Sequence, residues 1–304
     1  MKITDSKSLI KYIYSCVYLY FNLFERYSRK VLLKVFSKRL FNINHFKFDD
    51  FSEFKKEFDN QKKEKKLKKN HHWVSDKFLI DLKSLKNLPI KLYTNDWAAF
   101  MLDKHYHLTI KEFTFTPKRG DVVLDLGAYT GENCIYYSYL VGDSGNVYAF
   151  EFIDTNIENL EKNLSLNRNF SSNVKIIKNP VSDKIKKIYT SDQGPGTIAH
   201  DKKADHLELE FETITIDQFS KDYDLKKIDC IKMDIEGSEF DALVGGFETI
   251  KKFKPNLCIS AYHKIDDFYK LTKLIKKISK DYRFYLEHHH TSYMETVLYA
   301  TCRR

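Results

Sequence analysis

The stretch DVVLDLGAYTGE, residues 121–132, decides the fold of this chain. It begins with an apolar run typical of a buried strand, turns at Gly127 and Gly131, and continues into a helical pattern. Glycine adopts backbone angles that a side chain forbids and lets a ligand approach the main chain. The unpaired N–H groups of a helix N-terminus attract an anionic group. We therefore expect Asp125, Gly127, Ala128, Tyr129 and Gly131 to form part of a cofactor site.

The next predicted strand supplies the other half of this site. It ends in VYAFEF, residues 147–152, and Glu151 follows Gly127 by 24 residues. That is close to the spacing of about 20 residues at which an acidic side chain contacts a ribose, and Phe152 would lie beside it. The missing third glycine of a GxGxxG pattern argues against NAD or flavin. Asp125, shortly before the first glycine, favours a positively charged methionine moiety. In a structural alternative, the glycines serve only a tight turn.

From residue 118 onward, short strands alternate with helices. The predicted strands span residues 122–128, 146–152, 174–182, 228–235, 256–263, 283–290 and 295–301, and the predicted helices span residues 133–140, 156–167, 238–249 and 266–279. Continuous apolar runs are typical of strands buried on both faces of a parallel sheet, and the short connection between the last two strands predicts an antiparallel hairpin. The pattern predicts an α/β fold with a seven-stranded, mostly parallel sheet and an antiparallel edge strand. Residues 193–196 predict a loop over the site. The alternation of residues 207–216 predicts an added hairpin or a strand extension.

Polar side chains follow the fourth and fifth predicted strands. IKMDIEGSE, residues 231–239, places Asp234 after the fourth strand, and AYHKIDD, residues 261–267, places His263 and Lys264 after the fifth. Ligands of open α/β sheets bind at the carboxyl ends of the strands. We predict that Asp234 faces the cofactor or the acceptor, that His263 is the catalytic base because imidazole titrates near neutrality, and that Lys264 holds an acidic acceptor. A structural, hydrogen-bonded role is the alternative for His263.

Two further sets of residues are assigned from their place in the predicted sheet. Ser182 and Asp183 end the third strand and are expected at the adenine edge. We predict no metal, with Asp234, Glu236 and Glu239 as a weak alternative cation site. The glutamates there also suit a helix N-terminus without any ligand.

The basic charge of the chain is concentrated near its beginning. Residues 1–90 contain 21 Lys and Arg against 10 Asp and Glu, and the remainder is close to neutral. This argues against a nucleic-acid groove on the main domain. The apolar run of residues 12–24 is too short to span a bilayer, but it suits a peripheral membrane contact through residues 9–40. Docking on its own protein or on a second subunit, as a homo-oligomer, explains the same pattern. We expect a basic helical extension over residues 1–90 and a main domain over residues 91–304.

The chain from about residue 118 to its end resembles the FkbM-type methyltransferases. The matching pieces, in the order of the family, are DVVLDLGAYTGE, VYAFEF, ITIDQF, IKMDIEGSEFDALVGG, LCISAYHKIDD and ETVLYA. The resemblance implies a class I methyltransferase fold, S-adenosyl-L-methionine as methyl donor, and an oxygen acceptor. Tyr129 departs from it, since the family often has a small polar residue there, and this puts the local loop shape in doubt. Residues 1–90 lie outside the resemblance.

Motifs and resemblance together predict an O-methyltransferase. Its expected acceptor is a small molecule or glycan, in particular a sugar hydroxyl in surface polysaccharide biosynthesis. We expect a cytoplasmic protein, with a peripheral place at the inner face of the membrane if residues 9–40 bind lipid. The alternative is a non-catalytic module that keeps the methyltransferase fold and associates with a membrane or a partner.

Overall fold

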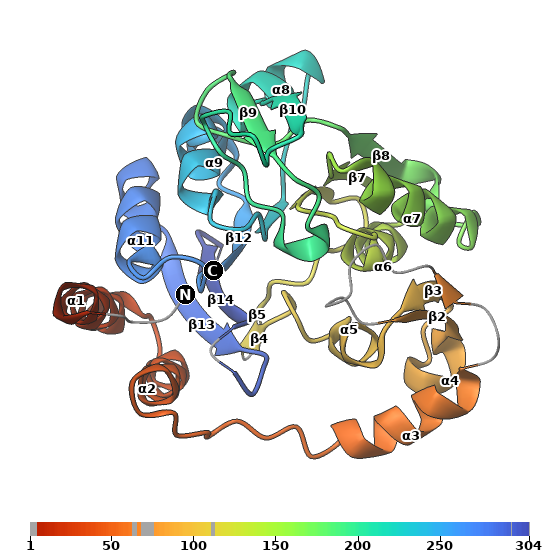
Figure 1. Ribbon diagram of the computed structural model, residues 1–304, viewed down its shortest axis with the longest axis horizontal. Helices are drawn as coiled ribbons and strands as arrows, with labels where there is room; N and C mark the ends of the chain where they lie inside the picture. Colours follow the sequence, from red (N-terminus) through yellow and green to blue (C-terminus); the bar gives the residue numbers. More distant parts are fainter. Residues whose placement is uncertain (1–4, 63–65, 68–75, 111–112, 293, 304) are drawn as a thin grey trace.

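The computed structural model describes residues 5–62, 66–67, 76–110, 113–292 and 294–303. Its centre is a seven-stranded sheet in the order β13-β14-β12-β11-β6-β7-β8 (Figure 1). The strands are β6 (Val122–Leu126), β7 (Asn146–Phe150), β8 (Val174–Ile177), β11 (Cys230–Met233), β12 (Asn256–Ser260), β13 (Arg283–His288) and β14 (Thr296–Thr301). β14 runs antiparallel to both of its neighbours, whereas β6, β7, β8, β11 and β12 pair in parallel. The predicted sheet is confirmed, and the antiparallel pair β13–β14 forms one of its edges.

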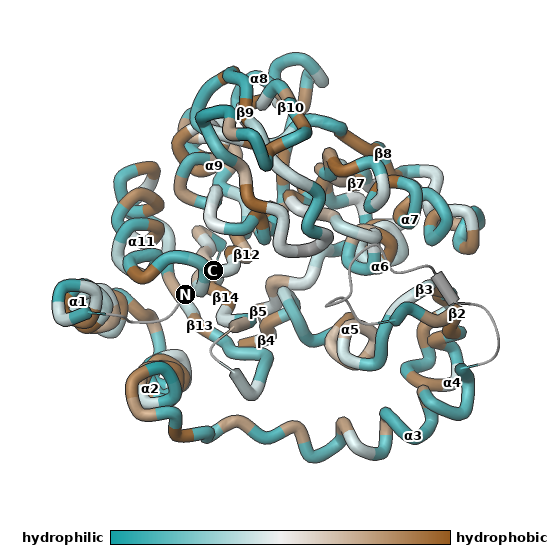
Figure 2. The backbone as a smooth tube through the Cα atoms, in the orientation of Figure 1, coloured by the Kyte–Doolittle hydropathy of each residue, from teal (hydrophilic) through white to brown (hydrophobic). Residues whose placement is uncertain are grey.

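Helices cover both faces of this sheet, because its strands are apolar on both sides. They are α6 (Glu132–Val141), α7 (Asp154–Ser165), α8 (Ile216–Asp222), α9 (Glu239–Gly245), α10 (Phe247–Phe253) and α11 (Asp267–Ile278). Leu124 and Ile231 face a core shared with α8 to α11, whereas Val123 and Cys230 face a second core shared with α6. Figure 2 shows hydrophobic residues along the central strands and hydrophilic residues over much of the outer surface.

The strand order reverses between β6 and β11. β6 pairs with β7 on one side and with β11 on the other, and the chain builds outward from this pair in both directions. The crevice at the carboxyl ends of two such strands is where open α/β sheets bind ligands. The glycine turn after β6 and the carboxylates after β11 therefore meet at this edge.

The first two helices pack on the face that carries α11. α1 (Ser6–Asn22) and α2 (Arg26–Phe41) contribute buried side chains such as Leu19 and Leu32 to that core. The segment between the helices and the first turn of α2 cover the edge strand β13: the Phe24 N–H donates to Phe284 O at 2.8 Å, and the Leu286 N–H donates to Ser28 Oγ of α2 at 3.0 Å. An open edge strand presents unpaired backbone groups, so this segment completes the sheet. No helix in the described parts of the chain is long and apolar enough to cross a membrane.

The chain then passes to the opposite face of the sheet (Figure 1). There it forms α3 (Phe51–Gln61), β1 (Lys66–Leu67), β2 (Lys77–Asp81), α4 (Leu82–Lys86), β3 (Lys91–Thr94), α5 (Asp96–Met101), β4 (Thr109–Ile110) and β5 (Phe113–Thr114). Strands β1 and β2 were not predicted, since the extension was expected to be helical. β2 pairs with β3 across residue 90, so the expected domain boundary falls inside one small sheet.

A short insertion lies between β8 and α8. It contains β9 (Lys187–Thr190), the 3-10 turn Gly194–Gly196 and β10 (Leu209–Glu212). β9 and β10 pair antiparallel, so the alternation of residues 207–216 marks one strand of this added pair, β10, and its partner lies earlier in the chain. A second 3-10 turn, Ser171–Asn173, leads into β8.

Candidate active site

A cavity of about 710 Å³ opens at the carboxyl ends of the central strands. The glycine turn after β6, the end of β7, the loop after β11 and the insertion all contribute to its wall. Gly194 and Thr197 line it, so the predicted loop does border the site. The predicted residues that line the cavity are Gly127, Ala128, Tyr129, Glu151, Phe152, Ser182, Asp234, Glu236 and Lys264. Asp125, Gly131, Asp183, Glu239 and His263 do not line it.

The turn at Gly127 is packed closely against the loop after β11. Gly127 has a φ of 81°, and a Cβ atom there would lie 1.9 Å from the backbone oxygen of Asp234. The Gly127 and Ala128 N–H groups donate to Phe150 O at 3.1 and 2.9 Å. Only glycine combines this left-handed backbone with this close approach. The turn therefore joins the ends of β6, β7 and β11 into one floor for the cavity.

Asp125 lies beneath that floor. Its side chain is fully buried, and the Lys232 Nζ lies 3.0 Å from its Oδ1. Lys232 also donates to Gly127 O at 2.6 Å, so the ion pair holds the turn from below. Burial raises the pKa of Asp125 above its ordinary value, although Lys232 acts in the opposite direction. Gly131, just before α6, likewise serves packing, since a Cβ there would lie 3.0 Å from the Leu160 side chain of α7.

Glu151 organises the loop that follows β7. Its Oε2 accepts from the Tyr129 N–H at 3.0 Å, and its Oε1 accepts from the Phe152 and Ile153 N–H groups, each at 2.9 Å. A carboxylate offers about four lone-pair sites, so Oε2 keeps capacity for a ligand hydroxyl. Burial raises the pKa of Glu151, while these backbone donors lower it.

The N-terminal region contributes residues that the sequence did not single out. Lys77, on β2, donates to Thr130 Oγ1 and to Glu132 at the start of α6, and its ammonium lies 4.5 Å from the centre of the Tyr129 ring. Burial raises the pKa of Glu132, but Lys77 outweighs it and holds the pKa below its ordinary value. Tyr129 has a φ of 50°. The residue that departs from the family pattern thus adopts a left-handed backbone and stacks on a lysine from outside the matched region.

Ser182 and Asp183 lie in the loop after β8, which ends at Ile177, and have different surroundings. Ser182 lines the cavity, and its Oγ donates to Asp183 Oδ1 at 3.0 Å. Asp183 turns toward Lys186, whose Nζ lies 3.2 Å away. Hydrogen bonding from Lys186 and Ser182 lowers the pKa of Asp183 despite the opposing effect of burial. Ser182 is thus the member of this pair that can touch a cofactor.

Asp234 stands between the glycine turn and the far end of the cavity. Tyr106 Oη donates to its Oδ2 at 3.0 Å, and Tyr262 Oη donates to its Oδ1 at 3.3 Å. Tyr106 also lies 3.0 Å from Ser260 Oγ. Burial raises the pKa of Asp234, but Lys232 and His263 outweigh it, so its pKa lies below the ordinary value. The tyrosines fix the direction of an ionised carboxylate that faces the cavity.

Glu295 is another carboxylate that lines the cavity, and the sequence analysis did not single it out. It lines the cavity just before β14, and its Oε2 lies 3.3 Å from His105 Nε2. Burial, with Asp234 nearby, raises the pKa of Glu295 to about 8. Because β14 runs antiparallel, its first residues lie at the edge where the parallel strands end. That topological signal could have identified Glu295, whereas no local pattern points to Lys77 or Tyr106.

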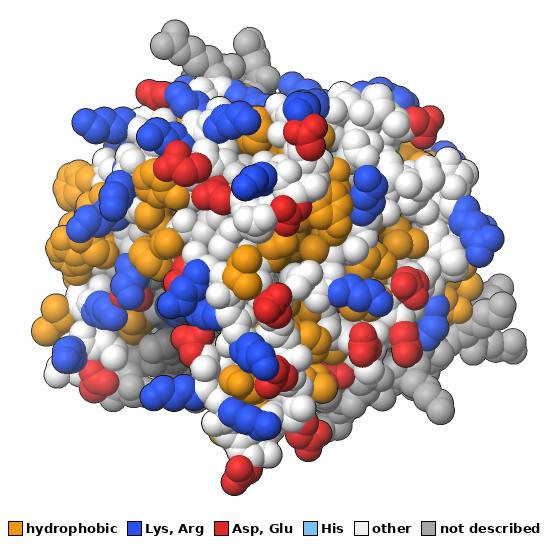
Figure 3. All heavy atoms as spheres, turned by 90° about the horizontal axis from the view of Figure 1, so that it is seen from above, with side chains coloured by type: hydrophobic (Ala, Val, Ile, Leu, Met, Phe, Trp, Pro, Cys, Tyr) orange, Lys and Arg blue, Asp and Glu red, His pale blue; other side chains and the backbone are white. Residues whose placement is uncertain are grey.

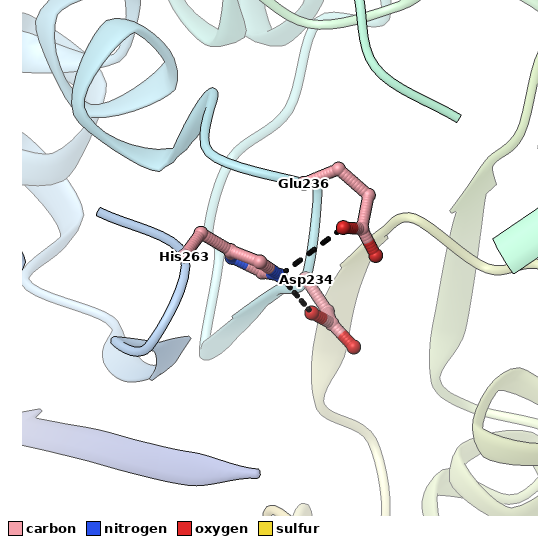
Figure 4. A group of neighbouring side chains, drawn as sticks. All are labelled: Asp234, Glu236 and His263. Carbon is pink, nitrogen blue, oxygen red and sulfur yellow. Dashed lines mark ion pairs between the residues drawn. The ribbon is translucent and has the colours of Figure 1, made fainter. Parts of the chain in front are cut away.

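His263 lies directly behind the carboxylates that line the cavity (Figure 4). Its Nδ1 lies 2.9 Å from Glu239 Oε1, and its Nε2 lies 3.6 Å from Asp234 Oδ1 and 3.5 Å from Glu236 Oε2. Burial lowers the pKa of His263, but Glu239, Asp234 and Glu236 outweigh it and raise the pKa to about 10. Lys264, the next residue, lines the cavity beside Gly237. The structure therefore brings His263, Asp234 and Lys264 to one place, as expected for residues after adjacent strands.

The seven-stranded sheet with its antiparallel pair at one edge has the class I methyltransferase fold. The chain belongs to the FkbM methyltransferase family, since the model of the methyltransferase FkbM domain matches residues 125–294, more than half of the chain. The sequence-based prediction of this family is confirmed, and with the family so is the prediction of S-adenosyl-L-methionine as the cofactor. No curated protein matches the chain significantly.

Solved structures with a similar fold include the methyltransferase FkbM from Methylobacillus flagellatus KT. The match has a TM-score of 0.59 and 20% identity, and it covers 97% of this chain and 60% of that chain. The chain thus spans about 60% of the length of that relative. Aeropyrum pernix fibrillarin, solved with natively bound S-adenosyl-L-methionine, matches at a TM-score of 0.39 and 14% identity over 60% of this chain and 67% of its own. A SAM-dependent methyltransferase from Aquifex aeolicus matches at a TM-score of 0.35 and 16% identity. That match covers 61% of this chain and 84% of the other.

Proposed function

We propose that this methyltransferase transfers a methyl group to a hydroxyl oxygen of a sugar or related small molecule in surface polysaccharide biosynthesis. The observation that carries the proposal is the position of Asp234. Its backbone oxygen touches the cofactor turn at Gly127, while its carboxylate faces the cavity and receives two tyrosine hydroxyls. One residue thus connects the expected place of the methyl donor with a group that can bind and deprotonate a hydroxyl.

The residues of the cavity fit the cofactor. When bound, S-adenosyl-L-methionine supplies an electrophilic methyl group on a positively charged sulfur. Gly127 lets the loop after β11 pack directly on the turn that lines the cavity, and Glu151 Oε2 keeps a lone pair for a ribose hydroxyl. Phe152 and Ser182 also line the cavity, and they can offer an apolar surface and a hydrogen-bonding hydroxyl to the adenine. Asp125 would act from beneath, by holding Lys232 against the turn.

The acceptor end of the cavity is rich in carboxylates. Asp234, Glu236 and Glu295 line it, and Lys232 and Lys264 are the cations that line the cavity near them. Carboxylates accept hydrogen bonds from hydroxyl groups, and like charges across a binding surface disfavour a carboxylate or phosphate at the reacting position. This composition supports a neutral, hydroxyl-bearing acceptor. The polysaccharide assignment itself rests on the family resemblance.

Asp234 is the proton acceptor that the geometry favours. It lines the cavity, whereas His263 lies behind it with both ring nitrogens directed at carboxylates. As the new C–O bond forms, the acceptor oxygen becomes acidic, and a carboxylate already aligned by Tyr106 and Tyr262 can take its proton. Alignment and deprotonation are the tasks of the protein in such a displacement. His263 then acts by positioning the carboxylates.

Methyl transfer from a radiolabelled donor to fractionated cell glycans tests the proposal. We expect label in a glycan fraction, and we expect Asp234→Asn to reduce the rate by at least about 100-fold while S-adenosylhomocysteine still binds in calorimetric titration. Label that appears only in protein or RNA fractions would contradict the acceptor class. Cofactor binding without transfer to any fraction would contradict the enzymatic proposal and favour a non-catalytic module.

A further inference from the structure

Three side chains at the acceptor end of the cavity form a compact group of cation-binding type. Asp234 and Glu236 come from the loop after β11, and His263 follows β12; one ligand atom of each lies within 4.8 Å of the other two. Figure 4 shows the imidazole edge and the two carboxylates directed toward a common point. Two carboxylates and one imidazole are a donor set that divalent transition-metal ions accept.

The orientation of His263 is set from behind. Its Nδ1 lies 2.9 Å from Oε1 of Glu239, a carboxylate whose side chain is only 1% exposed. The same Oε1 accepts from the Ile235 N–H at 3.0 Å, which holds the glutamate in place. A metal-bound histidine characteristically donates its other ring N–H to such a carboxylate, which fixes the tautomer and directs the remaining lone pair at the ion.

The remaining ring nitrogen is the observation that points to a ligand. The His263 side chain is about nine-tenths buried, and neither ring nitrogen makes a hydrogen bond among the described residues. Nδ1 has Glu239 Oε1 at 2.9 Å as an ion-pair partner, whereas Nε2 has no partner that close. The carboxylate oxygens in front of it are 3.5 and 3.6 Å away, beyond hydrogen-bonding distance. A buried polar atom without a partner is costly, and an ion between the three side chains would satisfy it together with both carboxylates.

We propose that Asp234, Glu236 and His263 bind a divalent transition-metal ion of the manganese or iron type, with its open positions facing the cavity. Asp234 and Glu236 line the cavity, so a hydroxyl of the acceptor can reach the ion from that side. The ion would orient this hydroxyl and increase its acidity. The role in methyl transfer rests on the proposed function, whereas binding of the ion does not.

Manganese binding to the chelator-treated protein tests the site directly. We expect one Mn²⁺ per chain, with dissociation constants below about 100 μM, by electron paramagnetic resonance, and loss of this binding in His263→Gln and Glu236→Gln. Glu239→Gln should weaken binding by about 10–100-fold, because it removes the group that orients the imidazole. Glu208→Gln, at an exposed residue of the insertion, should leave it unchanged. Thermal shift with S-adenosylhomocysteine verifies that each variant is folded.

The outcomes separate this inference from the proposed function. Absence of Mn²⁺ binding at millimolar concentration, or binding that His263→Gln leaves intact, would overturn the cation site. Glycan methylation that is equally fast with and without a strong chelator would overturn its catalytic role and leave the methyltransferase proposal standing. Stoichiometric binding without methylation of any fraction would contradict the proposed function while supporting the site.

A different observation, on the surface of α1, carries a second inference. One side of α1 packs on α11, where Tyr269 N–H donates to Ser15 Oγ at 2.8 Å. The other side is an exposed apolar stripe at helical spacing, which continues into the following turn: Ile10, Ile13, Val17, Phe21 and Phe24. Phe21 is 77% exposed. Figure 3 shows hydrophobic side chains gathered at the left edge, on the side where α1 lies in Figure 1. A helix that is apolar on both sides is ordinarily covered on both.

The charges beside this stripe indicate what covers it. Helices α1 and α2 contain no acidic residue, and α2 carries six basic ones, namely Arg26, Arg29, Lys30, Lys34, Lys38 and Arg39. A second copy of the chain would place such basic helices against each other around a twofold axis, which repulsion disfavours. An anionic lipid surface complements both the apolar stripe and the basic helix.

We infer that α1 and α2 attach the enzyme to an anionic membrane surface. We expect sedimentation with vesicles of phosphatidylcholine and phosphatidylglycerol, much weaker binding to pure phosphatidylcholine, and at least a tenfold loss for the double variant Val17→Ser, Phe21→Ser. Ile185→Ser, an exposed apolar residue of the insertion, is the matched control and should bind as before. Absence of vesicle binding, or a concentration-dependent dimer that the double variant abolishes, would overturn this inference.

Discussion

Lys77 on β2 and Glu132 at the start of α6 form a buried ion pair between residues 55 positions apart in the chain. Their side chains are 7% and 11% exposed. The pair connects the small N-terminal sheet to the helix that follows the cofactor turn. Residues before position 90 thus help to build the cofactor site.

Replacement of Lys77 by Met should destabilise the protein by about 3–5 kcal/mol, because it leaves Glu132 buried without its partner. The double variant Lys77→Met, Glu132→Gln should recover much of that loss, since the uncompensated charge is gone. Urea unfolding of the single and double variants measures both effects. A single variant as stable as the unmodified protein would show that the pair does not hold the two parts together.

Gly127→Ala should abolish cofactor binding, because the added Cβ would lie 1.9 Å from Asp234 O. Gly120→Ala is the matched control: Gly120 has the same φ of 81°, but its Cβ would meet only Ser144 Oγ at 3.5 Å. Both variants bear a backbone strain of about 1–2 kcal/mol, and only the first should lose S-adenosylhomocysteine binding in calorimetry. Equal affinities would mean that the turn does not form the cofactor floor.

Glu151→Gln should weaken S-adenosylhomocysteine binding by at least about tenfold. The amide presents one oxygen where the carboxylate presents two, and its NH₂ group would face backbone N–H donors from Tyr129 or from Phe152 and Ile153. Glu158→Gln, on the exposed side of α7, removes the same charge and should bind normally. Unchanged affinity in Glu151→Gln would place the ribose elsewhere in the cavity.

His107 should make the folded state acid-sensitive. Burial lowers its pKa to about 4, with Asp103 acting in the opposite direction, and its ring packs against Tyr136 and Tyr137. The unfolded chain binds a proton near pH 6.5, so the stability contributed by the neutral imidazole is present above that pH and is lost as pH falls toward 4.

The loss attributable to His107 amounts to up to about 3 kcal/mol at the acidic end. Measurement of the free energy of unfolding at a series of pH values from 7 to 4 gives this loss. In the His107→Gln variant, the free energy of unfolding should depend less on pH over this range. A slope that this substitution leaves unchanged would assign the acid sensitivity to other groups.

Much of the fold was predictable because its signals are local. All seven strands of the central sheet occur where apolar runs alternate with helical patterns. In the insertion, β10 lies within residues 207–216, where apolar and polar side chains alternate. The structure ends most strands earlier than predicted; β8, for example, stops at Ile177. Apolar residues continue past the last ladder hydrogen bond into the loops that form the cavity. Hydropathy alone does not mark that boundary.

The N-terminal region was less predictable, because its elements are short and are stabilised by what they pack on. β2 forms between a poorly patterned, lysine-rich segment and α4, and its hydrogen-bond partner β3 begins ten residues later. Secondary-structure propensity at Lys77 or Tyr106 does not reveal that their side chains reach the Glu132 carboxylate and the Asp234 carboxylate.

The sequence by itself determined the family, the cofactor and the strand ends that carry Gly127, Glu151, Asp234 and His263, since motif spacing on a parallel sheet delivers these residues to one edge. Only the tertiary structure decided that Asp125 lies beneath the cavity and that His263 stands behind the carboxylates. It also brought Lys77, Tyr106 and Glu295 to the site from distant segments. The positions of these residues depend on which segments pack against each other. Packing between distant segments does not produce a periodic hydrophobic pattern within either segment, so the sequence does not reveal it.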